Sequence, residues 1–334
     1  MSVNFSWPIY GQQAQQKFLQ SAIVNQRLAS TYLFYGPKGL GKKLTLDYFV
    51  KSILCLDEVQ KPCGKCEFCK LLEKKSYLDL YTIGDQQDDL SIDDIRDFIK
   101  RISLAKVHNQ VKIAIIYQGE NLNIYSSNAL LKTLEEPPLN TIMILVADQI
   151  NHLPATVLSR CQLVKFQALS NQDMLKWLQK FDLPEQEKET VINLSFGRPG
   201  LALSLMSDNL ETFKKNCNFI IKLLGGNTFN VMQTIDKWFE LLKKENPEAK
   251  SSDLGEMSRG YLDLLEVCCR DLLWLKLDRP VVNQIYREAL EKIADQFSVS
   301  SLLNNLKSLN YWKQQLKYNV NPQLLWENLF LNIK

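Results

Sequence analysis

Four cysteines lie close together in the first third of the sequence, at a spacing that could bind a metal ion. They are Cys55, Cys63, Cys66 and Cys69, which gives the pattern C-x7-C-x2-C-x2-C. Four thiolates complete a tetrahedral zinc site with no open position, so the set predicts a structural zinc rather than a catalytic one. Such an ion would hold together a segment at about residues 55–75 that is too small to build its own core. The alternative is a chance grouping or a redox pair.

A glycine-rich segment lies between a predicted strand at 31–35 and a predicted helix that runs to about Leu54. It contains Gly36, Gly39, Gly41 and Lys42, and fits the pattern G-x-x-x-x-G-K. Backbone N–H groups at such a helix N-terminus bind phosphates, and the lysine pairs with the β- and γ-phosphates. The alternative is a strand-to-helix turn that has no ligand.

The residue after this lysine decides whether a metal could join the nucleotide. A serine or threonine is expected there, because its hydroxyl binds Mg²⁺. The sequence has Lys43, and an ammonium group has donors only and repels a cation. We therefore expect neither bound Mg²⁺ nor intrinsic ATP hydrolysis, and the turn without a ligand is favoured over bound ATP.

An arginine stands at the end of an ordered series of elements between Ser126 and Cys161. A helix-forming run stops at Pro137, because proline cannot donate a backbone hydrogen bond and clashes with the preceding turn. A buried strand is predicted at 141–147, then a short helical turn that ends in Ser159-Arg160-Cys161, and a last strand at 163–166. Arg160 could still be half of an ordinary surface ion pair.

Two motifs of this stretch, NALLKTLEEPP at 128–138 and LSRC at 158–161, resemble the clamp-loader branch of the AAA+ ATPases. In that family the Ser-Arg-Cys arginine contacts the γ-phosphate of ATP held by the neighbouring subunit. The resemblance implies that Arg160 acts in trans on a neighbour's ATP as an arginine finger. The family also has a zinc module directly after the helix that follows the glycine-rich segment, which is called the P-loop. The four cysteines of this sequence lie at the corresponding place, which agrees with their spacing.

The chain departs from the family at two further positions. Active members have acidic residues after the strand that corresponds to 112–116, where this sequence has Tyr117 and Gln118. Glu120 lies too far along to replace them. Active members also have a polar residue that senses the γ-phosphate at the position of Ala147. With Lys43, these departures imply that the fold is kept and the hydrolytic site is lost.

The resemblance therefore implies a non-hydrolysing subunit, a stator, of a clamp loader that places a sliding clamp on primed DNA. Its implied partners are clamp-loader ATPase subunits and a delta-type subunit in a hetero-oligomeric ring, with clamp and DNA reached through the assembly. One alternative is an ATP-hydrolysing motor subunit of the same assembly. The other is a stand-alone zinc-containing DNA-binding module, which the near-neutral charge and the lack of a DNA-reading motif disfavour.

The predicted fold class is an α/β AAA+ P-loop domain with a parallel sheet, followed by a helical lid and an all-α C-terminal domain. We expect the first domain at 1–166, the lid at 167–207 and the helical domain at 208–334. In the last, Leu265, Leu272 and Leu302 belong to runs with helical spacing. Periodicity shows only a helical bundle there, and the resemblance implies an oligomerising collar.

The composition agrees with a chain of several domains. It has 334 residues, 46% of them hydrophobic, which predicts two or three domains with sizeable cores. A net charge of +3 gives no strong field that calls for nucleic acid. No apolar run is long enough to span a membrane and no signal-peptide pattern is present, so we expect a cytoplasmic protein with no membrane partner.

Overall fold

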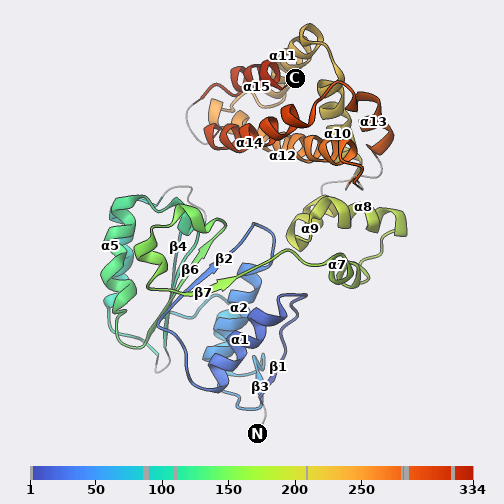
Figure 1. The fold of residues 1–334 in the computed structure, drawn as a ribbon. Helices are drawn as coiled ribbons and strands as arrows, with labels where there is room; N and C mark the ends of the chain where they lie inside the picture. Colours follow the sequence, from blue (N-terminus) through green and yellow to red (C-terminus); the bar gives the residue numbers. More distant parts are fainter. Residues whose placement is uncertain are drawn as a thin grey trace. The chain divides into compact units, whose positions relative to one another are not determined.

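The computed structural model describes residues 3–85, 90–108, 111–207, 210–279, 281, 286–316 and 320–333. The chain forms two compact units, one of Met1–Leu183 with Ser195–Ala202 and one of Pro184–Leu194 with Leu203–Lys334 (Figure 1). The predicted domain boundaries at 166 and 207 stay a prediction. One predicted boundary, the start of the helical domain at Asp208, lies outside the described residues.

The first unit is built on a five-stranded sheet in which every pair of neighbours is parallel, as predicted. In spatial order its strands are β4 (Leu80–Ile83), β5 (Lys112–Ile116), β6 (Thr141–Ala147), β2 (Thr31–Tyr35) and β7 (Gln162–Lys165). Every residue of β5 and β6 is buried. A central parallel strand is covered on both faces, and this explains the continuous apolar runs in the sequence.

Helices cover both faces of this sheet (Figure 1). The helical segments of the unit are α1 (Gln13–Val24), α2 (Lys42–Leu54), α3 (Glu67–Glu73), α4 (Ile92–Ser103), η1 (Gly119–Asn121), α5 (Ile124–Glu135), η2 (Ile150–His152), α6 (Ala155–Leu158) and α7 (Asn171–Leu178). On one face, residues of α1, α2 and α3 share a core with Phe34 and Phe166. On the other face, α4 and α5 pack over Leu33 and Leu145.

Local sequence sets the ends of the helices on that second face. Ser91 begins α4 with a capping box, in which its hydroxyl accepts from the Asp94 N–H while the Asp94 carboxylate accepts from the Ser91 N–H. The Asn123 side chain caps α5 by accepting from two N–H groups of its first turn. The helix ends at Glu135, just before the two prolines, as predicted.

A second, two-stranded parallel sheet joins the start of the chain to the cysteine segment. It pairs β1 (Asn4–Phe5) with β3 (Gln60–Lys61), with Asn4 opposite Gln60. Nearby, the Trp7 indole N–H donates to the Ser52 hydroxyl at 2.9 Å inside the protein. The sequence analysis did not predict this pairing, because a two-residue strand leaves no periodic signal.

The second unit is entirely helical among its described residues. It contains α8 (Glu185–Ser195), α10 (Leu210–Gly225), α11 (Thr228–Glu245), α12 (Ser251–Lys276), α13 (Arg287–Ala294), α14 (Val299–Gln315) and α15 (Pro322–Asn332), while α9 (Pro199–Ser207) begins in the first unit and ends in the second. Trp326 and Phe239 are fully buried in its core. Leu265, Leu272 and Leu302 lie in the same core, which confirms the helical spacing predicted for them.

Among the described helices, none combines the length and the apolar content that crossing a membrane requires.

Candidate functional site

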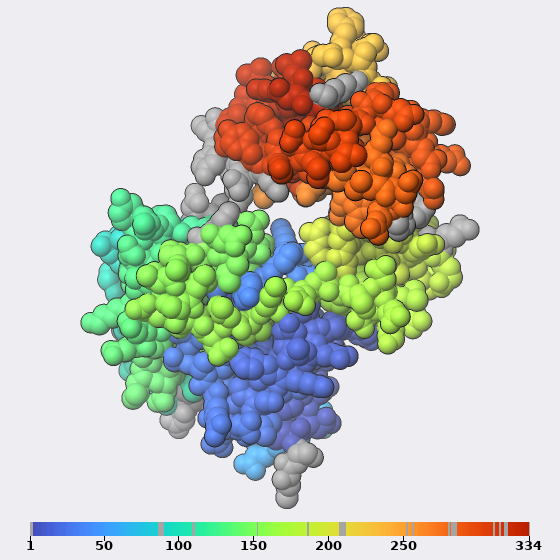
Figure 2. Space-filling view, in the orientation of Figure 1, coloured from blue at the N-terminus to red at the C-terminus, as the bar shows by residue number. Residues whose placement is uncertain are grey.

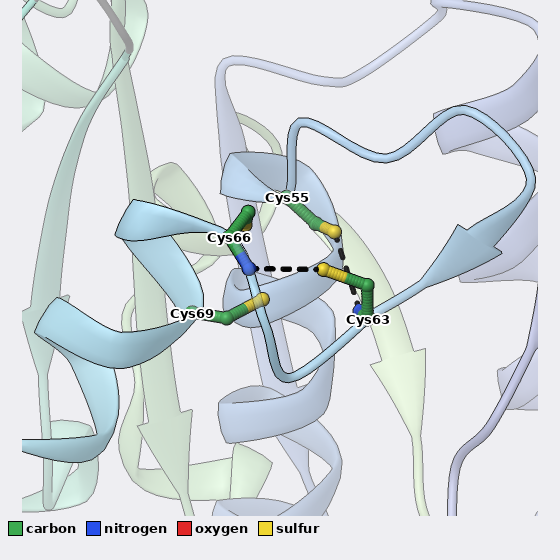
Figure 3. Close-up of side chains that lie close together, drawn as sticks. All are labelled: Cys55, Cys63, Cys66 and Cys69. Atoms are coloured by element: carbon green, nitrogen blue, oxygen red, sulfur yellow. Dashed lines mark hydrogen bonds between the residues drawn. The ribbon is translucent and has the colours of Figure 1, made fainter.

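The four predicted cysteines come together at one point beside the end of α2. Their sulfur atoms all lie within 4.8 Å of one another, and Figure 3 shows the side chains pointing toward a common centre. Cys55 directly follows α2, Cys66 precedes α3 and Cys69 lies within it. Cys55 and Cys69 are buried, whereas the other two are half-buried. An all-sulfur set of four is the donor chemistry of a closed structural zinc site, so these residues fit the ion that the sequence predicts.

Backbone N–H groups donate hydrogen bonds to two of the four cysteine sulfurs. The Cys63 sulfur accepts from the N–H groups of Lys65 at 3.4 Å and Cys66 at 3.3 Å, and the Cys55 sulfur accepts from the Cys63 N–H at 3.3 Å. The two bonds from Lys65 and Cys66 lower the pKa of Cys63 to about 6. Burial raises the pKa of Cys55, and it raises that of Cys69 to about 12. The loop around Cys63 therefore favours a thiolate before any ion binds.

An aromatic stack fixes α3 to the edge of the main sheet. The His108 ring stacks on Tyr77, with ring centroids 4.8 Å apart, and Phe68 of α3 meets both rings edge-on. The His108 Nδ1 atom lies 3.0 Å from Asp79 Oδ2, and this carboxylate is fully buried. Burial opposes ionisation of Asp79, but N–H groups of Val107 and His108 outweigh it, so its pKa lies below the usual value. The aromatic stack thus attaches the cysteine segment to the sheet, and the buried Asp79 carboxylate holds the histidine of that stack in place.

The predicted P-loop connects β2 to α2 in the expected conformation. Gly36, Gly39 and Gly41 have φ angles of 139°, 87° and 83°, which side chains of L-residues rarely adopt. A Cβ atom on Gly36 would lie 2.4 Å from the Phe166 carbonyl oxygen, so that position has no room for one. Gly39 also meets the start of α9, where its carbonyl accepts from the Gly200 N–H at 2.8 Å. The loop glycines are therefore required by the conformation of the backbone, whether or not a ligand binds.

The P-loop lysine is engaged by the protein's own oxygen atoms. Lys42 is buried, and its Nζ atom donates to Asp148 Oδ1 at 2.7 Å, to the Pro37 carbonyl at 3.0 Å and to the Gly36 carbonyl. Asp148 directly follows β6, the strand beside β2. Lys42 was predicted from the sequence, whereas Asp148 was not. A signal was available, because the carboxyl ends of adjacent parallel strands meet at one edge of a sheet.

Lys43 lies at the position where a metal ligand would be needed. Its Nζ atom is 2.6 Å from Asp85 Oδ1 and 5.0 Å from the centre of the Tyr117 ring. Tyr117 follows β5 and is buried, which raises the pKa of its hydroxyl. The lysine and the tyrosine, identified separately as departures from the family pattern, are therefore in contact with each other. A cation over an aromatic face, with a carboxylate as its other partner, provides no ligand for Mg²⁺.

Arg160 lies at the surface of the first unit, just after α6. The segment of α6 and β7, lime green in Figure 2, forms part of the visible surface. The NH2 group of Arg160 donates to Glu135 Oε1 at 3.2 Å, and its NH1 group donates to the Thr156 carbonyl at 3.0 Å. The Nε atom has no hydrogen-bond partner among the described residues. The Arg160 side chain is 29% exposed and that of Glu135 is 60% exposed, so solvent screens the ion pair and Glu135 can be exchanged for another anion at modest cost.

Comparison with protein families covers most of the chain in two segments. Residues 11–170 match the model described as DNA polymerase III, delta subunit. Residues 230–334 match the model described as DNA polymerase III, delta subunit, C terminal. The first segment contains the P-loop, the cysteine cluster and Arg160, and the second contains most of the helical unit.

Individual relatives carry more than one subunit name. Subunit delta' of DNA polymerase III from Bacillus subtilis strain 168 is 28% identical over 329 residues, which cover 95% of this chain and 94% of the relative. Subunit tau from the same organism is also 28% identical, over 96% of this chain, but the chain spans only 59% of that relative's length. Among solved structures, a gamma subunit-related protein from Thermotoga maritima covers 97% of this chain at 15% identity, with a TM-score of 0.40.

Proposed function

Because this chain belongs to the family of DNA polymerase III clamp-loader subunits, we propose that it is the delta'-type member, a stator that does not hydrolyse ATP. The carrying observation is the contact of Lys43 with Asp85 and Tyr117. An ammonium group occupies the position of the hydroxyl that would bind Mg²⁺, and an aromatic ring follows the strand where an acidic residue is needed. Phosphoryl transfer depends on metal ions that neutralise the developing charge, so this site lacks its main means of catalysis.

The proposed contribution of the chain to ATP hydrolysis is made through Arg160, in trans. The guanidinium is near the surface and is paired with an exposed Glu135 carboxylate. A γ-phosphate on a neighbouring subunit would replace Glu135 as a stronger, more highly charged acceptor. The arginine would then stabilise the transition-state charge at the neighbour's site. The proposed partners are therefore ATPase subunits of the clamp loader, together with a delta-type subunit, and through them the sliding clamp and primed DNA.

The substitution Arg160→Ala tests the proposed finger in a reconstituted clamp loader. We expect the variant to fold and assemble normally, while ATP turnover at that interface falls by up to about 10³-fold. Arg96→Ala is a matched control, because Arg96 is also a surface arginine with a carboxylate partner, Asp93. Unchanged turnover by the Arg160→Ala assembly would contradict the proposal.

The second candidate function is an ATP-hydrolysing motor subunit, and the retained Lys42 together with the likeness to a tau subunit favours it. Steady-state ATP hydrolysis by the purified chain with Mg²⁺ separates the two functions. The stator proposal expects no turnover. Turnover that Lys42→Ala abolishes would establish the motor function instead, with metal ligands other than those at Lys43 and Tyr117.

We also propose that the cysteine cluster holds a structural zinc ion. The support is the convergence of four sulfurs and the N–H groups directed at two of them. When bound, the ion would connect the end of α2 to the start of α3 and would supply no catalytic chemistry, because four protein ligands leave no open position.

A further inference from the structure

The ammonium group of Lys42 has no hydrogen left to offer a phosphate. A protonated lysine has three donors. In this structure they meet one carboxylate oxygen and two carbonyl oxygens, from Asp148, Pro37 and Gly36. The side chain is only 7% exposed, so water does not easily replace these partners. A nucleotide phosphate could bind Lys42 only by displacing one of these three oxygens, and Asp148 provides the one that a side-chain rotation can remove.

The position of Asp148 is set by the sheet and by a neighbouring turn. Strand β6 lies beside β2 with Ala147 opposite Tyr35, and the Gly36 N–H donates to the Ala147 carbonyl at 3.2 Å. This register places the next residue, Asp148, beside the first residues of the P-loop. The Asp148 N–H donates to Glu120 Oε2 at 3.0 Å, which ties the backbone to η1. The carboxylate is therefore held at the loop by fixed elements.

The next residue in the chain after Lys42, Lys43, also has a carboxylate partner. Lys43 is bound to Asp85 at 2.6 Å. The two lysines that begin α2 and the two aspartates that face them carry no net charge together. A nucleotide-binding P-loop offers a triphosphate positive charge. Here the two carboxylates cancel the charge of the two lysines, so that attraction is lost.

We propose that Asp148 is the internal ligand of this P-loop: its carboxylate occupies the place of a nucleotide phosphate at Lys42 and makes the site selective against nucleotides. The inference rests on the proposed function, because it explains how a subunit that does not hydrolyse ATP keeps a folded P-loop without ATP. It concerns binding, whereas the stator proposal concerns hydrolysis and Arg160.

The contact between the P-loop and α9 supports the same assignment. Gly39 and Gly200 lie so close that a Cβ on Gly200 would be 2.8 Å from the Gly39 Cα atom. Together with the hydrogen bond between these residues, this close packing holds the middle of the loop through protein contacts alone. The middle of the loop and its C-terminal end are therefore held by the chain itself, at Gly39 and at Lys42.

Removing the charge of Asp148 should create a nucleotide site. When the binding-competent state is a small fraction of the population, the apparent Kd rises by the inverse of that fraction. In Asp148→Asn the competing carboxylate is gone, and we expect ADP to bind at least about tenfold more tightly than to the wild-type chain. Calorimetric titration of the full-length chain with ADP, without Mg²⁺, measures this. The variant should also gain thermal stability from ADP, which the wild type should not.

Three further variants keep the test decisive. The double variant Lys42→Met, Asp148→Asn should lose the gained affinity, because the ammonium that receives the phosphate is absent. Asp97→Asn removes a carboxylate from an exposed pair with Lys100 and should leave ADP affinity unchanged. If Asp148→Asn does not fold, Asp148→Ser provides the same loss of charge with a smaller side chain.

Equal ADP affinity of Asp148→Asn and wild type would overturn the assignment, as would tight ADP binding by the wild-type chain. ATP hydrolysis by the wild type, measured in parallel with Mg²⁺, would instead overturn the proposed stator function. An unchanged ADP affinity together with no hydrolysis would remove only the role of Asp148.

Discussion

The cysteine cluster and the P-loop are two candidate sites at opposite ends of helix α2, and they differ in whether their ligand-binding groups are available. The cluster has its complete set of ligand atoms, all within 4.8 Å, in a segment with few core residues. The P-loop has its full backbone path and sits on the buried strand β2, but the groups that should receive nucleotide and metal are bound to Asp148, Asp85 and Tyr117.

This difference shows which sites depend on a ligand for their structure. A short segment that is too small to build a core of its own depends on a bound ion for much of its order. A loop at the end of a buried strand is already ordered by the sheet, and its cations can be neutralised by carboxylates of the same chain. We therefore expect the cluster to be sensitive to loss of its ion and the P-loop to be insensitive to loss of nucleotide.

Loss of one cysteine ligand should have the largest effect. In Cys69→Ser the proposed zinc site loses a buried thiolate, and we expect bound zinc to fall from about one ion per chain to nearly none. Metal analysis after gel filtration, with hydrogen exchange of residues 55–73, measures this. Cys161→Ser is the matched control, because Cys161 is half-buried and lies outside the cluster. Equal zinc content in both variants would mean that the cluster is not the metal site.

The second largest effect is expected when a side chain is added at the first P-loop glycine. Gly36→Ala combines a φ of 139° with a contact of 2.4 Å to the Phe166 carbonyl, so we expect unfolding to become easier by about 3 kcal/mol or more. Gly41→Ala is the control, because its φ is 83° but no atom lies within 4 Å of the added carbon. There we expect a loss of about 1–2 kcal/mol. Urea unfolding compares the two, and equal losses would show that the backbone contact is not decisive.

The buried Asp79 should make the attachment of the cysteine segment sensitive to acid. Because its folded pKa is lower than its unfolded one, its contribution to stability is present above the ordinary aspartate pKa of about 3.9 and is lost as the pH falls through the folded value. We expect Asp79→Asn to cost about 1.5–3 kcal/mol at neutral pH. The variant should also weaken the fall in stability below about pH 4.

Unfolding free energies measured from pH 6 down to pH 3 test this prediction. Asp97→Asn again serves as the control, because Asp97 is largely exposed and paired with Lys100. If Asp79→Asn and wild type lose stability in parallel over this range, another carboxylate is responsible for the acid sensitivity.

Restoring the missing hydroxyl should have the smallest effect. Lys43→Thr breaks an exposed ion pair with Asp85, so stability should change by no more than about 0.5 kcal/mol. We expect no ATP turnover, because Tyr117 still stands where an acidic metal ligand is needed and Asp148 still holds Lys42. Colorimetric phosphate release with Mg²⁺ measures turnover. Hydrolysis by this single variant would mean that the P-loop had lost only its metal ligand.

Much of the fold was predictable because its signals are local in the sequence. The buried strands at 31–35 and 141–147 were both predicted at their exact bounds. The four cysteines were found for the same reason, because one short segment contains them all. Glycine spacing likewise located the loop from Gly36 to Lys42.

The partners of the charged groups were not predictable from local patterns. Asp148 is 106 positions from Lys42 and Glu135 is 25 positions from Arg160. Their pairing depends on strand order and on the packing of α5 against α6, which no short pattern contains. The aromatic stack of Phe68, Tyr77 and His108 was missed for the same reason. The sequence thus located the candidate sites, and the tertiary structure defined their present chemical state.

The strand order has a consequence for how the chain is made. Translation produces β2 early, yet both of its neighbours in the sheet, β6 and β7, come from residues 141–147 and 162–165. The four cysteines leave the ribosome within one short segment, and contacts between residues near in sequence form first. The P-loop must wait for Ala147 and Asp148, which hold Gly36 and Lys42. On the ribosome, all four cysteines are therefore available well before the loop that precedes them in the sequence can be held in place.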